Sequence, residues 1–158
     1  MNIMGNLHVV PGLVPVDVGS TGTEIFTDVI DSGEYTELEF IVALGAITTD
    51  DTVIKLYSDA NTVAAGGTAI AFKYKLSSAL GTDASGAWTA NASTGLTLTA
   101  VTDNNKTLRV QVDSRLCDAL PYVYLGIDPG ESQTVGFYSV IAIGVPKWSQ
   151  SIPLSTVD

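Results

Sequence analysis

Apolar and polar residues alternate along this chain in short runs, which clusters of Gly, Asp, Asn, Ser and Thr separate. Runs of this length, rich in β-branched and aromatic residues and bounded by turn-forming ones, predict β-strands rather than helices. About eight short strands are typical of a two-sheet antiparallel sandwich, so the pattern predicts an all-β, jelly-roll-like fold. The segments that we expect to form strands are residues 24–30, 38–44, 53–57, 70–76, 96–99, 108–112, 122–127 and 137–145.

Three segments carry additional signals about packing, side-chain direction and helix formation. Residues 38–44 are apolar on both faces, which indicates a strand packed on both sides. Within 70–76, Lys73 and Lys75 are two residues apart and therefore lie on one side of the strand. Residues 113–120 carry the best helical pattern, so we expect one short helix there.

The two ends of the chain differ from the strands between them. Residues 9–16 combine apolar side chains with two prolines, which disfavour a helix and remove donors from a β-ladder. We expect residues 1–23 to form an extended arm that lies across another surface, either of this domain or of a neighbouring subunit. Residues 24–145 then form the sandwich domain and residues 146–158 a C-terminal tail. The candidate contact residues are Val9, Val10, Leu13, Val14 and Val16 in the arm, with Trp148 and Ile152 in the tail.

Composition narrows the class of protein. Apolar residues make up 46% of the chain, but they are spread evenly and no run approaches the roughly 20 apolar residues of a membrane-spanning helix. The N-terminus lacks the basic start and apolar core of a signal peptide, so we expect neither membrane insertion nor export. The formal charge is −10, and the seven basic residues form no dense stripe. Nucleic-acid binding is therefore not expected.

Candidate catalytic residues are scarce. His8 is the only histidine and lies in the proline-flanked arm, where nothing rigid would orient a catalytic base. Cys117 is the only cysteine, and its apolar neighbours predict a buried structural thiol in a reducing compartment. One histidine and one cysteine cannot build a typical zinc site. We expect no enzymatic activity, no metal centre and no cofactor.

Acidic residues leave one alternative open. Asp50 and Asp51, with Asp59, and the segment 103–105 offer oxygen ligands of the kind that calcium prefers. Neither group has the spacing of an EF-hand loop, and turns use the same residues for backbone hydrogen bonds. Glu37 and Glu39 are two residues apart in a strand, so they point to the same side. Calcium binding near Asp50 and Asp51 stays open.

Aromatic residues support a second alternative. Trp88, Tyr122, Tyr124, Phe137 and Tyr138 could form a platform on which sugar rings stack, although such residues more often pack in a core or an interface. The alternative function is therefore a carbohydrate- or receptor-binding sandwich of a virion fibre or a cell surface.

Several stretches follow one another in the order found in a known family. These are residues 35–47, residues 52–59, residues 108–120 followed by 122–127, and residues 140–144. Over about residues 24–145 the chain resembles a family of small structural proteins of tailed bacteriophages, which are associated with the capsid as decoration (cement) proteins. The longer polar insert at 77–95 and the terminal tail depart from that family.

The resemblance implies a non-enzymatic virion protein, assembled in the host cytoplasm. It would bind the exterior of the capsid, with the major capsid protein as its partner, and stabilise the expanded shell. A homotrimer is expected because such shells have local three-fold points.

Overall fold

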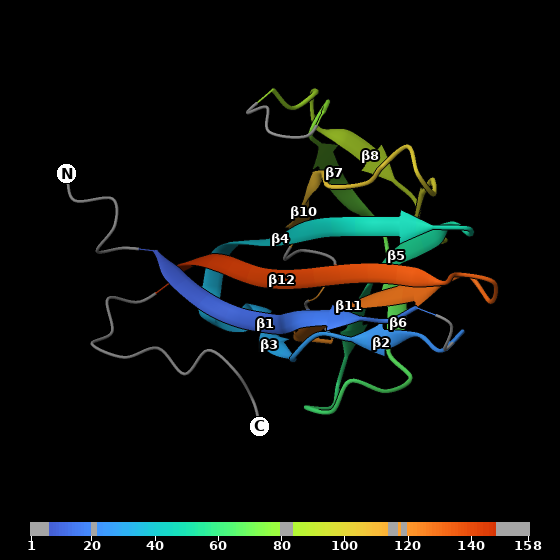
Figure 1. Cartoon of the computed structure of the whole chain (residues 1–158). Coiled ribbons are helices and arrows are strands. Elements are labelled where there is room, and N and C mark those ends of the chain that lie inside the picture. The colour runs from blue at the N-terminus through green and yellow to red at the C-terminus, as the bar shows by residue number, and fades with distance from the viewer. Residues whose placement is uncertain (1–6, 20–21, 80–83, 114–116, 118–119, 148–158) are drawn as a thin grey trace.

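The computed structural model describes residues 7–19, 22–79, 84–113, 117 and 120–147. These residues form two antiparallel β-sheets packed face to face, with one short 3-10 turn, η2 (Ser32–Glu34) (Figure 1). The all-β sandwich predicted from the pattern is thereby confirmed. Within the described part of the chain no helix is long and apolar enough to cross a membrane.

Sheet A contains the longest strands. In spatial order it consists of β1 (His8–Asp17), β12 (Val135–Pro146), β4 (Tyr35–Thr48), β10 (Thr107–Val112), β7 (Phe72–Leu76) and β8 (Thr89–Asn91). Sheet B consists of β2 (Ile25–Phe26), β11 (Tyr122–Pro129), β5 (Thr52–Asp59) and β6 (Thr68–Ile70), with β3 (Ile30–Asp31) also paired to β11 and β9 (Leu96–Leu98) to β5.

The order of the main strands is that of a jelly roll. Without the added strands, the two sheets read β1-β12-β4-β10 and β2-β11-β5-β6. The first and last strands of the chain pair with each other, and the chain passes from one sheet to the other between most consecutive strands. This is the double Greek key of a jelly roll.

The described residues form more strands than the sequence predicted, because two expected strands are divided and because β1 and β8 lie where no strand was expected. Segment 24–30 splits at Thr27, whose backbone N–H donates to the Leu125 carbonyl (3.0 Å) between β2 and β3. Segment 70–76 splits at the exposed Ala71, where the chain leaves sheet B and enters sheet A. β8 lies in the polar insert at 77–95.

The described part of the expected N-terminal arm is an edge strand of this domain. Residues 8–17 pair with β12 from His8 opposite Gly144 to Asp17 opposite Phe137, with irregularities on both sides of Leu13. Prolines are tolerated on an edge strand because one side of its backbone makes no ladder bonds. The boundary expected between residues 23 and 24 therefore does not separate β1 from the sandwich. The helix expected over 113–120 falls largely outside the described residues, as does the tail from residue 148 onward.

The core lies between the two sheets, and β4 contributes to it with one face only. Leu38, Phe40, Val42 and Leu44 are buried, whereas Ala43 is exposed and the intervening residues are half-buried. The prediction that this strand is packed on both sides is thus wrong for the described residues. Cys117 is buried and makes no disulfide, as predicted. The fully buried partners of β4 in the core include Ile54, Leu56, Leu108, Val110, Leu125, Ile127 and Val140.

Close packing of β12 against β4 allows a test of this core. A Cβ added at Gly144 would overlap the ring of Tyr35, which is 1% exposed. We expect Gly144→Ala to lower the free energy of unfolding by about 1–3 kcal/mol, the usual cost of overpacking. Gly86→Ala is the matched control, because no atom lies within 4 Å of its added Cβ. Urea denaturation of the two variants measures the difference; equal stability would contradict this packing.

Candidate functional site

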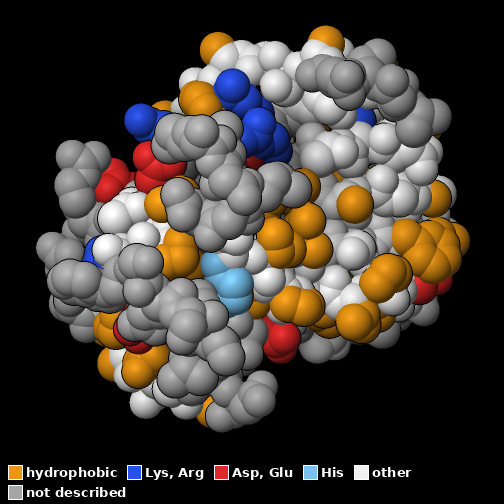
Figure 2. Space-filling model, turned by 90° about the vertical axis from the view of Figure 1, so that its left-hand side faces the viewer, with side chains coloured by type: hydrophobic (Ala, Val, Ile, Leu, Met, Phe, Trp, Pro, Cys, Tyr) orange, Lys and Arg blue, Asp and Glu red, His pale blue; other side chains and the backbone are white. Residues whose placement is uncertain are grey.

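The outer face of sheet A carries a contiguous group of exposed apolar side chains along β1 and β12. Val9 is 56% exposed and Val14 72% exposed on β1, and Phe137 (46%) and Ile141 (40%) are exposed on β12. Strand register brings Val9 opposite Ile143, and Ile141 opposite Ile41 of β4. We call these residues, Val9, Val14, Ile41, Phe137, Ile141 and Ile143, the apolar strip. Figure 2 shows hydrophobic side chains gathered on this side of the molecule.

The strip exists because β12 is apolar on both faces. Tyr138, Val140 and Ala142 point into the core, and the residues that alternate with them point outward. Only one face of a strand can enter the core between two sheets, so the other face remains at the surface. A contiguous exposed apolar surface usually marks an interaction site.

The structure divides the contact residues predicted in the arm. Val9 and Val14 lie in the apolar strip and are available to a partner. Val10 is fully buried, and Leu13 and Val16 pack against the core, so these three attach β1 to its own domain instead of binding another molecule. The tail residues Trp148 and Ile152 lie outside the described residues.

Sequence reasoning missed Ile141 as a candidate contact and considered Phe137 only as part of a sugar-stacking platform. Both residues were assigned to the last strand, residues 137–145. The available signal was the length of the apolar run from Val140 to Val145, which has no polar position on either face.

A basic cluster lies on the same outer face, beyond β4. The ammonium group of Lys75 lies 5.0 Å from the centre of the Trp88 ring, and the guanidinium of Arg109 lies 5.6 Å from it. Arg109 also donates two hydrogen bonds to the Glu39 carboxylate, one of 2.8 Å from Nη2. These bonds raise the pKa of the Arg109 guanidinium. Lys73 shares this face with Lys75, as predicted. We call Lys73, Lys75, Trp88 and Arg109 the basic cluster, and Figure 2 shows the grouped basic side chains next to the hydrophobic ones.

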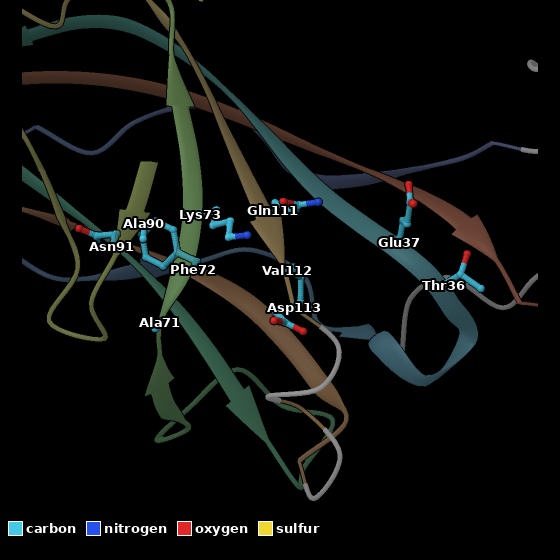
Figure 3. A pocket seen from close by; sticks show the side chains of 10 residues that line it. All are labelled: Thr36, Glu37, Ala71, Phe72, Lys73, Ala90, Asn91, Gln111, Val112 and Asp113. Carbon is cyan, nitrogen blue, oxygen red and sulfur yellow. The ribbon is translucent and has the colours of Figure 1, made fainter. Parts of the chain in front are cut away.

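Two hollows open beside the basic cluster. The first has a volume of about 330 Å³ and is formed by β4, β7, β8 and β10 with adjoining residues; Figure 3 shows its side chains. The second, of about 280 Å³, lies over β4, β10 and β12 and includes Ile41 and Ile143 of the apolar strip. Glu37 and Gln111 line both, so the hollows adjoin. The first is lined by Thr36, Glu37, Ala71, Phe72, Lys73, Ala90, Asn91, Gln111, Val112 and Asp113.

The outer face of sheet B is different because its side chains satisfy one another. The rings of Tyr57 and Tyr124 stack with centroids 5.3 Å apart, and Phe26 packs edge-on against both. The Tyr57 hydroxyl donates to Glu24 (2.9 Å), and Lys55 pairs with Asp128 (2.9 Å). Each of these side chains therefore already has a contact within the chain.

The aromatic platform that the alternative function requires is not formed by the described residues. Tyr138 is buried in the core, where its hydroxyl bonds Thr52. Tyr124 is buried at sheet B, while Phe137 is exposed at sheet A. Trp88 lines neither hollow, and its ring already contacts two cations.

The carboxylates considered for calcium serve as turn acceptors. Asp50 accepts backbone N–H groups from Asp51 (2.9 Å) and Ser132 (3.2 Å), and Asp51 accepts that of Ala100 (2.8 Å). Asp59 lies at the opposite end of β5, about 25 Å away at the usual rise of a strand, so it cannot join them. No group of three or more His, Cys, Asp or Glu among the described residues could hold a metal ion.

His8 has a structural partner. Its Nδ1 shares a hydrogen bond of 2.7 Å with the hydroxyl of Tyr35, and the two rings stack. Cys117 lies elsewhere, with its thiol against the Asp113 carbonyl (3.6 Å). This contact holds His8 against the start of β4.

Comparison of this chain with protein-family models, with curated proteins and with solved structures gives no match. The site is therefore interpreted from its own geometry.

Buried tyrosines predict loss of stability at alkaline pH. Burial raises the pKa of Tyr35 to about 12, while an unfolded tyrosine titrates near 10. The neutral hydroxyl is thus favoured in the folded chain, so its contribution is complete below pH 10 and is lost as the pH rises towards 12. At about pH 11.5 we expect Tyr35 alone to remove about 2 kcal/mol.

Urea denaturation of the wild type and of Tyr35→Phe at neutral and alkaline pH measures this effect. The variant lacks the ionisable hydroxyl and should lose less stability than the wild type over the same range. Burial also raises the pKa of Tyr57, Tyr124 and Tyr138, so the variant keeps part of the loss. Identical losses in the two proteins would show that Tyr35 is not responsible.

Proposed function

We propose that this protein is a non-enzymatic decoration (cement) protein of a tailed-bacteriophage capsid, which binds the outside of the expanded shell through the apolar strip. The observation that carries the proposal is the exposure of Val9, Val14, Phe137 and Ile141, between 40% and 72%, along two paired strands. The order of sequence motifs that resembles the decoration family supports the same role.

The size of the strip favours binding of many copies. Covering a fully exposed Val, Ile or Phe side chain contributes about 1.5–3 kcal/mol, so each half-exposed member contributes about 1 kcal/mol. Four of them give about 4 kcal/mol, which alone corresponds to a dissociation constant near 1 mM. A homotrimer that presents three strips to a lattice of major capsid protein would gain its affinity through multivalency.

The rigidity of the site suits a mechanical role. β1 is held by its ladder to β12 and by Val10 in the core, so Val9 and Val14 are presented on a fixed surface. A strip bound across the boundary of two capsid subunits must be uncovered before these subunits separate. Because exposing apolar surface to water costs free energy, this burial opposes separation of the subunits under the outward pressure of packaged DNA.

Surface substitutions test the strip more cleanly than removal of the arm. Deleting residues 1–20 would take away β1 and with it the fully buried Val10, so the sandwich itself would suffer. We expect Val14→Asp to weaken co-sedimentation with expanded capsids at least tenfold, because a carboxylate would be buried against an apolar surface. Val63→Asp is the matched control: Val63 is 68% exposed, as against 72% for Val14, and lies between β5 and β6, outside the strip.

Saturable binding that is lost with Val14→Asp and kept with Val63→Asp supports the proposal. Equal binding by both variants would exclude the strip as the contact, and no binding by the wild type would exclude decoration of that capsid. Analytical ultracentrifugation of the free and bound protein tests the trimer.

A further inference from the structure

The first hollow combines groups that bind a polar ligand. Phe72, Val112 and two alanines supply apolar surface, and charged or amide side chains stand around them. Its volume of about 330 Å³ lies at the lower end of the range for small-ligand sites. Most lining residues belong to β4, β7, β8 and β10 of sheet A, so most of the polar groups are carried on a rigid support; Figure 3 shows their side chains.

Several of these polar side chains make no ion pair or side-chain hydrogen bond with the described residues. Lys73 and Lys75 have no ion-pair partner among the described residues, and the side chains of Gln111 and Glu37 make no hydrogen bond there. The charge of Arg109 is largely offset by Glu39. Two lysines without an ion-pair partner among the described residues, on one strand, are notable in a chain whose formal charge is −10.

Strand register places these groups in two adjoining rows. Gln111 lies opposite Lys73, and Lys73 opposite Ala90; one pleat further, Arg109 lies opposite Lys75. Lys73 and Lys75 are thus about 7 Å apart along β7. Lys75 lines neither hollow, but its contact with the Trp88 ring holds its ammonium group in place one pleat along β7 from Lys73.

We propose that this hollow and the basic cluster bind an acidic oligosaccharide, one whose sugar rings carry carboxylates. Lys73 and Lys75 bind carboxylates of neighbouring sugars through charge-assisted hydrogen bonds. The amide of Gln111 and the carboxylate of Glu37 bind ring hydroxyls, to which they can donate and accept respectively. The second hollow, which shares Glu37 and Gln111, extends the groove for a longer chain.

The same surface disfavours single-stranded nucleic acid, the other anionic polymer with rings. The carboxylates of Glu37 and Glu39 stand in the hollows and repel both kinds of polyanion, but they can accept hydrogen bonds from the ring hydroxyls of a uronic-acid chain, which a deoxyribose-phosphate chain lacks. The first hollow contains no residue of the apolar strip, so binding there is separate from the proposed capsid role. Only the second hollow shares residues with the strip, namely Ile41 and Ile143.

Isothermal titration calorimetry of the full chain with tri-galacturonate tests the proposal. We expect saturable binding that weakens with added salt and falls about tenfold in Lys73→Gln, which removes one charge-assisted contact. Lys75→Gln should weaken binding to a similar extent. Lys147→Gln removes the same charge at the end of β12, outside both hollows, and should leave binding unchanged.

The ligand supplies a further control. The methyl ester of tri-galacturonate keeps the rings and hydroxyls but lacks the charge, so it should bind much more weakly than the acid. Equal binding of acid and ester, or equal loss in Lys147→Gln and Lys73→Gln, would overturn the assignment of the lysines. Tighter binding of oligothymidylate would replace the saccharide with a nucleic acid, and absence of binding to tri-galacturonate would refute the site.

Discussion

The pairing of β12 with both β1 and β4 is the interaction on which the rest of the molecule depends. It joins the last strand of the chain to the first and places both beside the strand that carries most of the core. Because β12 has only one face to give to the core, its other face supplies Phe137 and Ile141 to the surface. The ladder that closes the jelly roll thereby creates the surface that we assign to the capsid.

Fold class was readable from the sequence, because period-two patterns and turn residues are local signals. The point at which a strand leaves one sheet for the other could not be predicted in the same way. The crossing at Ala71 depends on which strands pair with β6 and with β7, and this is not a local signal. The site was readable only in part. Val9 and Val14 were predicted as contacts for their apolarity, yet the same reasoning included Val10, since only pairing with β12 decides which side chains of β1 enter the core.

The two outer faces show how a sandwich can separate stability from recognition. On sheet B, the stacked rings of Tyr57 and Tyr124 and the ion pair between Lys55 and Asp128 satisfy the surface side chains through contacts within the chain. On sheet A, apolar side chains and lysines stand without such partners. A surface whose side chains already pair with one another gains little binding free energy from a partner. A surface with exposed apolar side chains and cations without ion-pair partners gains binding free energy when a partner covers them.

Twist decides whether the two proposed sites of sheet A exclude each other. β7 lies three strands from β12, which is about 14 Å at the usual strand spacing. Neighbouring strands rotate by about 20–25°, so the surface over β7 faces a direction some 60–75° away from that over β12. Figure 1 shows β7 and β8 running obliquely to β12, as this rotation requires. A flat shell that covers the apolar strip therefore leaves the basic cluster turned towards its side, where an acidic oligosaccharide can reach Lys73 while the protein stays bound.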